Sequence, residues 1–213
     1  MTNKTQKFWD REAEKYDSRE RQFETVFEEV ITKTKKYLNT NDNVLDFGCA
    51  TGEKTIELAK TTRHVHGLDI SHEMINKAVQ KKNDANIQNC SFSQGTIFDN
   101  DFKNGSFNAI VSYHVIHLLE DIEKVLQKIH ELLKPDGLFI LTTVCLKDKM
   151  TFKKRLEISV FLMIKRLGIL PVNLNLLASK DLEIKIKNGN FQMVESVNFF
   201  QGVTTKLIVA RKN

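Results

Sequence analysis

Cysteine, proline and glycine are all scarce in this chain of 213 residues, which has three, two and nine of them respectively. The cysteines, Cys49, Cys90 and Cys145, are widely separated, and no pair has the Cys-x-x-Cys spacing. This excludes a disulfide framework and a cysteine-based zinc site, so we expect reduced thiols, a cytoplasmic location and no bound metal. The chain also lacks any low-complexity tract or linker rich in glycine and proline, which predicts one domain spanning 1–213.

Long hydrophobic runs are also absent. The longest apolar-rich run, 158–164, is far too short to span a bilayer. The first residues include Asp10, Glu12 and Glu14 and have no apolar stretch of the signal-peptide type. We therefore expect a soluble protein that contacts a membrane peripherally, if at all.

Positive charge is unevenly distributed. The formal net charge is +5, yet residues 147–213 carry 13 Lys and Arg against 5 Asp and Glu. Within that part, residues 147–170 hold 7 basic and 2 acidic residues, which equals the excess of the whole chain. A local excess of this kind indicates a partner more strongly than a diffuse one does.

Hydrophobic periodicity predicts strands and helices that alternate from residue 43 onward. Two helices, at 4–17 and 20–38, come first. The predicted strands are 44–47, 65–68, 90–94, 107–112, 138–143, 191–200 and 203–210, and the predicted helices among them are 53–62, 72–82, 121–133, 151–167 and 179–188. Ser71 is the predicted N-cap of the helix 72–82, Phe23 is predicted on the apolar face of the helix 20–38, and residues 134–137, Lys-Pro-Asp-Gly, are predicted to form a turn. Near-continuous apolar strands that alternate with helices favour a parallel sheet covered on both faces. The fold class is therefore α/β, a three-layer sandwich around a doubly wound, mostly parallel seven-stranded sheet, with a C-terminal hairpin and a helical insertion after strand five.

The stretch 43–52, Asn-Val-Leu-Asp-Phe-Gly-Cys-Ala-Thr-Gly, joins a buried strand to a helix. Asp46 stands at the carboxyl end of the strand, and Gly48 and Gly52 let the backbone approach a ligand closely. A carboxylate beside such a loop repels pyrophosphate, but it suits a ligand that carries an ammonium and a sulfonium group. Asp69 ends the next strand, 17 residues past Gly52, where a carboxylate can accept hydrogen bonds from ribose hydroxyls.

Four motifs in order resemble the class I S-adenosylmethionine-dependent methyltransferases: VLDFGCATG (44–52), HGLDIS (66–71), SFNAIVSYHVIHLLED (106–121) and LLKPDGLFILTT (132–143). The resemblance implies S-adenosylmethionine as cofactor, S-adenosylhomocysteine as product and an antiparallel strand that completes the seven-stranded sheet. It also implies that the opening Phe8-Trp9 to Tyr16-Asp17 belongs to a helix that closes over the cofactor. Residues 1–39 are then lid helices, 43–145 the cofactor-binding core, 147–178 a substrate lid, and 179–213 a C-terminal helix and hairpin.

The resemblance also implies a set of cofactor-binding residues. Asp46 would face the methionine amino group, Asp69 the ribose and Ile70 the adenine. The full set is Tyr16, Asp46, Gly48, Cys49, Ala50, Gly52, Asp69, Ile70, Met74, Thr96, Ile97, Ser112 and His117. Two positions depart from the family pattern: Ala50 stands where glycine is more common, and Thr96 where an acidic residue often binds adenine. Asp99 is a candidate replacement for that acid.

Catalytic candidates follow the fourth strand, whose carboxyl end faces the transferred methyl group by resemblance. His114 and Tyr113 are the candidates for a general base or for positioning the nucleophile. The expected reaction is in-line displacement of the methyl group by an N or O nucleophile of a small, hydrophobic or lipid-like acceptor. An RNA or protein methyltransferase and a non-catalytic S-adenosylmethionine-binding protein remain alternatives. Residues 112–115 lack the N/D-P-P-Y/F tetrapeptide, no RNA-binding module is recognisable, and no nucleic acid partner is expected.

The insertion 147–170 combines seven Lys and Arg residues with apolar residues around nearly the whole circumference of its predicted helix. Two interpretations stay open. The insertion is either a substrate lid that packs on the domain or on a second subunit, or a surface that contacts anionic membrane or lipid. Either a monomer or a homodimer fits the sequence.

Overall fold

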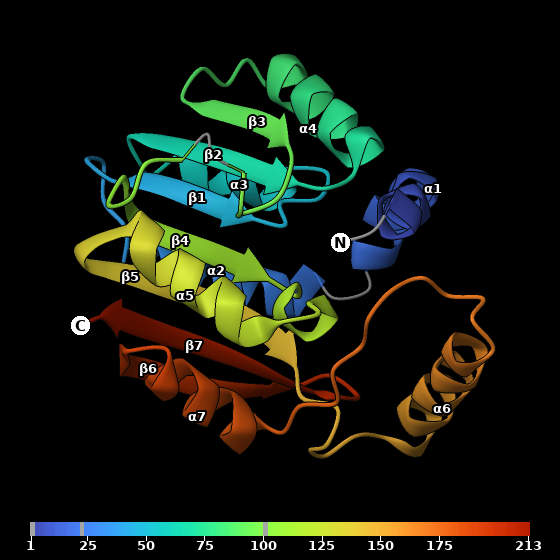
Figure 1. Ribbon diagram of the computed structural model, residues 1–213. Helices are drawn as coiled ribbons and strands as arrows, with labels where there is room; N and C mark the ends of the chain where they lie inside the picture. Colours follow the sequence, from blue (N-terminus) through green and yellow to red (C-terminus); the bar gives the residue numbers. More distant parts are fainter. Residues whose placement is uncertain (1–2, 22–23, 100–101) are drawn as a thin grey trace.

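The computed structural model describes residues 3–21, 24–99 and 102–213, which form one seven-stranded sheet with helices on both faces (Figure 1). The strands lie in the order β3-β2-β1-β4-β5-β7-β6, and β7 runs antiparallel to both of its neighbours. Their bounds are β1 Asn43–Phe47, β2 His64–Asp69, β3 Cys90–Gln94, β4 Phe107–Tyr113, β5 Leu133–Val144, β6 Phe191–Phe200 and β7 Thr204–Lys212. The predicted α/β fold with an antiparallel C-terminal hairpin is confirmed.

The helices occur where the sequence predicts them. Their bounds are α1 Asn3–Glu20, α2 Glu24–Lys35, α3 Glu53–Ala59, α4 His72–Asp84, α5 Ile122–Leu132, α6 Phe152–Arg166 and α7 Ser179–Asn188, with a short 3-10 helix η2 at Ile116–Leu118. Ser71 caps α4 as predicted, because its hydroxyl accepts a hydrogen bond from the Met74 backbone N–H. Phe23, predicted on the apolar face of the second helix, lies outside the described residues. In the described ranges, no helix combines the length and apolar character needed to cross a membrane.

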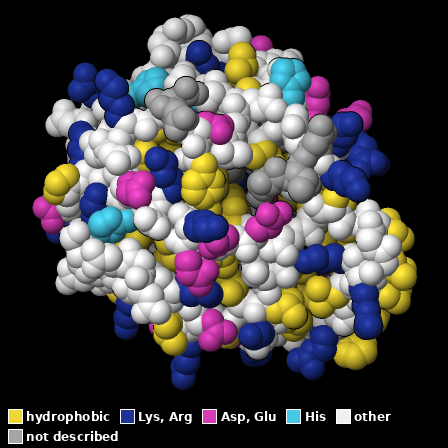
Figure 2. Space-filling model, viewed as in Figure 1, with side chains coloured by type: hydrophobic (Ala, Val, Ile, Leu, Met, Phe, Trp, Pro, Cys, Tyr) yellow, Lys and Arg dark blue, Asp and Glu magenta, His cyan; other side chains and the backbone are white. Residues whose placement is uncertain are grey.

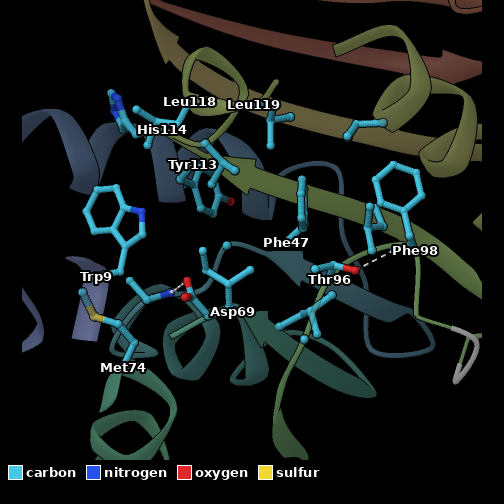
Figure 3. Close-up of a pocket in the computed structure, with 18 of the residues that line it drawn as sticks. Trp9, Phe47, Asp69, Met74, Thr96, Phe98, Tyr113, His114, Leu118 and Leu119 are labelled. Atoms are coloured by element: carbon cyan, nitrogen blue, oxygen red, sulfur yellow. Dashed lines mark hydrogen bonds between the residues drawn. The ribbon is translucent and has the colours of Figure 1, made fainter. Parts of the chain in front are cut away.

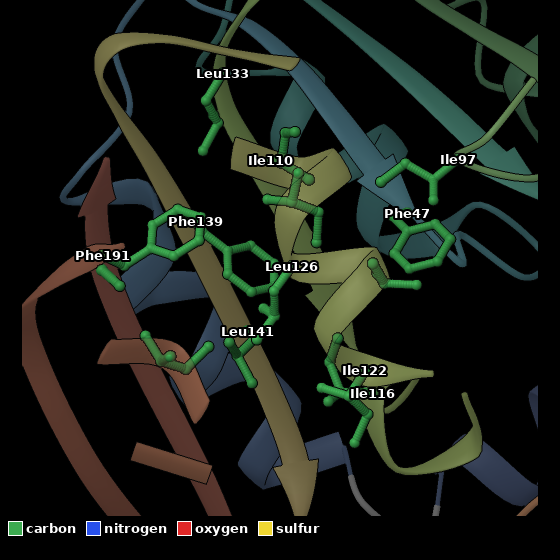
Figure 4. Close-up of a cluster of buried hydrophobic side chains, with 14 of the residues drawn as sticks. Phe47, Ile97, Ile110, Ile116, Ile122, Leu126, Leu133, Phe139, Leu141 and Phe191 are labelled. Atoms are coloured by element: carbon green, nitrogen blue, oxygen red, sulfur yellow. The ribbon is translucent and has the colours of Figure 1, made fainter. Parts of the chain in front are cut away.

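Two hydrophobic clusters fill the space on either side of the sheet. One joins α5 and α7 to one face through Leu126, Ile129 and Leu182, and it includes the ring pair Phe139 and Phe191 (Figure 4). The other joins α2 and α3 to the opposite face, with Val30, Ile31, Leu58 and Ala59 among its members. Burial on both faces explains why the central strands are almost entirely apolar, and it confirms the three-layer arrangement.

The start of β5 differs from the prediction. Residues 134–137 were predicted to form a turn before a strand at 138, but β5 begins at Leu133. Phe107 pairs with Leu133 and Ala109 pairs with Leu138, so the residues between form a bulge against β4, in which Asp136 has φ +60°. Lys-Pro-Asp-Gly chemistry suits a bulge as well as a turn, because both need a backbone that leaves the extended conformation.

The order of the strands predicts a binding site beyond the carboxyl ends of the central strands. The chain moves outward from β1 through β2 to β3, and then returns to β4 on the other side of β1. Ligands of open α/β sheets bind at such a switch point, beyond the carboxyl ends of the strands. Asp46 of β1 pairs with Gly67 of β2 and with Val111 of β4. The segments that follow these three strands therefore meet at the same end of the sheet.

Candidate active site

The loop 48–52 is held against the end of β2 by backbone hydrogen bonds. The N–H groups of Gly48 and Cys49 both donate to the Leu68 carbonyl, at 2.8 and 3.1 Å. Gly48, Ala50 and Gly52 all have positive φ, between 48° and 79°. A Cβ on Gly48 would lie 2.2 Å from the side chain of Val115, so glycine is required there for steric reasons as well. Ala50 has φ +48°, the left-handed conformation that glycine adopts most readily.

Asp69 fixes the loop from the other side. One carboxylate oxygen accepts from the Ala50 N–H at 3.0 Å, and the other accepts from the Ser71 N–H at 2.9 Å. Each carboxylate oxygen has two lone pairs, so both can still accept a hydrogen bond from a ligand. Burial raises the pKa of Asp69 to about 6, although these backbone N–H groups favour the charged form.

Asp46 lies beneath the loop and is fully enclosed. Its Oδ2 accepts a hydrogen bond from the Thr55 hydroxyl at 2.6 Å, whereas Oδ1 has no partner among the described residues. Burial raises the pKa of this carboxyl to about 6. A buried acceptor without a partner is costly unless a ligand completes its hydrogen bonding. The two carboxylates beside the loop, Asp46 and Asp69, therefore fit a positively charged ligand. The nearby cations, Lys54 and Lys81, are each paired with carboxylates of their own: Lys54 with Glu20, and Lys81 with Asp17 and Glu53.

A pocket opens above this loop, at the carboxyl ends of β1, β2 and β4 (Figure 3). Ten of the predicted site residues line it: Tyr16, Gly48, Ala50, Asp69, Ile70, Met74, Thr96, Ile97, Tyr113 and His114. Trp9 and Tyr16 reach it from α1, and Leu118 and Leu119, at the end of η2, also line it. The wall is mostly apolar, with Asp69 at its centre.

The five other predicted cofactor-binding residues lie behind the pocket wall. Asp46 has been described above. Cys49 is buried, and burial raises the pKa of its thiol. Gly52 packs against Phe92 and Ala78, where an added Cβ would lie 2.8 Å from each. Ser112 donates to the Phe47 carbonyl at 3.1 Å, and a ring nitrogen of His117 lies 2.8 Å from the Thr143 hydroxyl. Through these contacts the five residues support the pocket wall from behind. That they contact the cofactor stays a prediction.

Acidic side chains of helix α1 bind it to the segments around the pocket through hydrogen bonds and an ion pair. Asp10 accepts from the Ser71 hydroxyl at 2.7 Å, Asp17 accepts from the Thr51 hydroxyl at 2.5 Å, and Glu20 pairs with Lys54 at 2.6 Å. These contacts hold α1 at the pocket, where Trp9 and Tyr16 pack against Ala50 and Met74. Burial raises the pKa of Tyr16, and the nearby carboxylates Glu20 and Asp69 raise it further, so its hydroxyl stays protonated.

The two catalytic candidates, Tyr113 and His114, differ in whether their polar atoms are free to contact a substrate. The Tyr113 hydroxyl donates to the Thr34 hydroxyl of α2 at 3.0 Å, and burial raises the pKa of the phenol. His114 is half-buried at the pocket wall with φ +61°, and its ring packs edge-on against Phe27. Burial lowers the pKa of His114 to about 3, and the adjacent His117 contributes to this shift. At neutral pH His114 is therefore uncharged and a weak base, and Tyr113 is a neutral phenol.

The end of the pocket beyond β3 includes residues that the sequence did not single out. Phe98, Glu120 and Lys124 contribute to the lining. Asp99, the candidate replacement for the adenine-binding acid, instead accepts from the N–H of Thr96 at 2.6 Å and from its hydroxyl at 3.0 Å. The Phe98 side chain is 50% exposed at the mouth. In the sequence, the signal for this part of the wall was a phenylalanine just past the Gly95-Thr96 segment, between two predicted strands.

The comparisons with known proteins agree with the fold and the motifs. A methyltransferase-domain family matches residues 38–191. The methyltransferase YcgJ of Bacillus subtilis is 28% identical over 146 residues, which cover 66% of this chain and 54% of its own. The phosphoethanolamine N-methyltransferase of Plasmodium falciparum is 32% identical over 115 residues, which cover 53% of this chain and 42% of its own.

The crystal structure of YcgJ from Bacillus subtilis has the same fold, with a TM-score of 0.71 at 16% identity over 87% of this chain and 99% of that one. The present chain spans about half the length of the curated relatives it matches. The match of the family to more than half of the chain, together with the strand order and the four motifs, places this protein in the methyltransferase-domain family, among the class I S-adenosylmethionine-dependent methyltransferases.

Proposed function

We propose that this protein transfers the methyl group of S-adenosylmethionine to an N or O nucleophile of a small, partly apolar acceptor by in-line displacement. The observation that carries the proposal is the pairing of two carboxylates, the buried Asp46 and the half-buried Asp69, with an apolar pocket that continues to His114. The carboxylates suit a cationic cofactor, and the apolar continuation suits an organic acceptor of limited size.

Each part of the cofactor has a complementary surface in this chain. The free lone pairs of Asp69 would accept hydrogen bonds from the ribose hydroxyls, and Oδ1 of Asp46 would face the ammonium group, directly or through water. Ile70, Met74 and Ile97 would enclose the adenine ring, with the Thr96 region at its edge. When bound, the cofactor supplies a methyl group on a sulfonium, which is already activated for attack.

The acceptor would occupy the part of the pocket near Trp9, His114 and Leu118. Because His114 has a pKa of about 3, it can accept a hydrogen bond but cannot readily remove a proton from an alcohol. This favours an uncharged amine, or an oxygen acid already ionised at neutral pH. Alignment alone can then supply roughly 7–11 kcal/mol of the barrier reduction. The name of the Plasmodium falciparum relative, a phosphoethanolamine N-methyltransferase, supports a small-molecule acceptor.

Turnover of methyl-labelled S-adenosylmethionine tests this proposal. The protein is incubated with a metabolite and lipid extract, with total RNA and with a protein fraction in separate reactions. We expect label in a small molecule of the first reaction only. Label in RNA or protein would establish the macromolecular alternative. Cofactor binding without transfer in any fraction would establish a non-catalytic role.

His114→Asn is expected to lower kcat about tenfold, the value of one hydrogen bond of about 1.4 kcal/mol, and to leave the Kd for S-adenosylhomocysteine unchanged. Asparagine tolerates the positive φ of this position, so the backbone is preserved. Above pH 5 the rate should show no step from His114, because the ring is already neutral there. Steady-state kinetics and calorimetry measure the two quantities. His72→Asn, at an exposed histidine on α4, is the matched control, and full activity of His114→Asn would remove His114 from the mechanism.

A further inference from the structure

Helix α6 carries a continuous apolar stripe that the rest of the described chain leaves uncovered. Its members are Phe152, Leu156, Val160, Met163 and, just past the helix end, Leu167, with exposed fractions of 82%, 57%, 44%, 57% and 67%. At 3.6 residues per turn, these five side chains fall within roughly 80° of the helix circumference. None of the side chains of α6 is fully buried. Exposed apolar stripes of this length mark interaction sites.

Basic side chains border the stripe on both sides. On the helical projection, Lys153 lies along one edge, and Arg155 and Arg166 lie along the other. All three are exposed, and among residues 3–21, 24–99 and 102–213 no carboxylate pairs with any of them. Glu157, the acidic residue of the helix, is engaged by Lys154 at 2.7 Å. Figure 2 shows the result over α6 at the lower right, where hydrophobic side chains are bordered by Lys and Arg.

The stripe does not face the pocket. The described lining of the pocket includes no residue of 147–178. The part of the insertion that follows α6 nevertheless contacts the pocket wall. The side-chain amides of Asn173 and Asn175 both donate to the Leu119 carbonyl at 2.6 Å. The Thr5 hydroxyl of α1 donates to the Pro171 carbonyl at 2.7 Å. These contacts anchor the base of the insertion and leave the outer face of α6 free.

We propose that the outer face of α6 docks on an anionic lipid surface. An apolar stripe flanked by cations on both sides lets the stripe enter the boundary of headgroups and acyl chains while the cations reach the lipid phosphates. The uncompensated charge of residues 147–170 favours an anionic surface. The proposal does not depend on methyl transfer, since docking needs no turnover.

Charge complementarity favours a lipid surface over a second copy of this chain. A symmetric contact between two copies would place the same face of α6 on both sides of the interface. Lys153, Arg155 and Arg166 of one copy would then approach the same cations of the other, with no free carboxylate on either helix to offset them. An anionic lipid surface instead neutralises all three.

Vesicle sedimentation of the purified full chain tests the electrostatic half of the proposal. We expect binding to vesicles that mix phosphatidylglycerol with phosphatidylcholine, and weak binding to phosphatidylcholine alone. Each cation near an anionic surface contributes about fivefold to binding, so Lys153→Gln, Arg155→Gln and Arg166→Gln together should lower the partition coefficient roughly 100-fold. The matched control is Lys36→Gln, Arg63→Gln and Lys187→Gln, which removes the same charge from exposed residues outside α6 and should change binding little.

The apolar half is tested without any change of charge. Leu156→Ser with Met163→Ser should lower partitioning at least tenfold, whereas Val79→Ser with Ile184→Ser, at exposed apolar residues of α4 and α7, should not. Unchanged melting temperatures would show that every variant is folded. Absence of binding by the unmodified chain, or equal loss with the control sets, would overturn the proposal. A dimer in sedimentation equilibrium that dissociates with Leu156→Ser and Met163→Ser, without vesicle binding, would assign the stripe to a second copy instead.

Discussion

Replacing Asp69 by alanine is expected to raise the Kd for S-adenosylhomocysteine roughly 10- to 100-fold. Hydrogen bonds to a charged group contribute about 1.5–3 kcal/mol, and each 1.4 kcal/mol corresponds to a factor of ten in Kd. The loss has two parts. In the proposed site the ribose hydroxyls would lose their acceptor, and the Ala50 N–H loses its hydrogen bond to the Asp69 carboxylate. Isothermal titration calorimetry measures the change.

The pH dependence of binding should follow from the same residue. Burial raises the pKa of Asp69 to about 6, so protonation in the free protein removes the charged acceptor at moderately low pH. Affinity should therefore fall as the pH drops through 6 in the unmodified protein, and this step should be smaller in Asp69→Asn. Asp84→Ala, at an exposed carboxylate near the end of α4, is the control and should bind normally. Unchanged affinity of Asp69→Ala would exclude the ribose role.

Asp46→Asn is expected to stabilise the unliganded protein at neutral pH and at the same time to weaken cofactor binding. The folded-state pKa of Asp46 is raised to about 6 from an ordinary value of 3.8. A raised pKa means that the folded state holds its proton more tightly than the unfolded state. The associated stability is present at low pH and is lost as the pH rises through 6. At neutral pH the buried charge therefore costs about 1–3 kcal/mol, which asparagine removes.

For a domain of this size, about 1 kcal/mol corresponds to a shift of roughly 2–4 °C in Tm, so calorimetry at neutral pH should show a clear increase. The difference between the two proteins should shrink as the pH falls from 6 and disappear at about pH 3, where Asp46 is protonated in both the folded and the unfolded state. Thr55→Val is the opposite control, because it removes the hydroxyl that donates to Oδ2 and should destabilise the protein. A lower Tm for Asp46→Asn at neutral pH, or undiminished affinity for the cofactor, would contradict this role.

Opposite effects on stability and on binding would show that Asp46 is maintained for function. Its Oδ1 has no protein partner within the described residues, and a carboxylate in that situation reduces the stability of the empty site. Strain of this kind is typical of binding sites, because the ligand supplies the missing interaction.

Features encoded within a short stretch of chain were predictable from the sequence. The alternation of apolar strands and amphipathic helices predicted the layers, and Ser71 marked the start of α4, since a cap involves residues only three positions apart. Gly48 and Gly52 marked the loop. The bulge at 134–137 was predicted as a turn, because its form depends on pairing with β4 and not on the four residues themselves.

The sequence by itself determined the fold class and the family, and it predicted the loop 48–52 as the cofactor-binding corner, because strand ends, glycine turns and their carboxylates follow one another along the chain. Only the tertiary structure decided which side chains are free to act. Tyr113 is held by Thr34, 79 residues away, and Asp46 is left with an unpartnered oxygen. The sequence likewise showed that α6 is apolar and basic, but only the packing of the chain decided that its apolar stripe is exposed. Burial depends on contacts between distant segments, which periodicity along one helix does not encode.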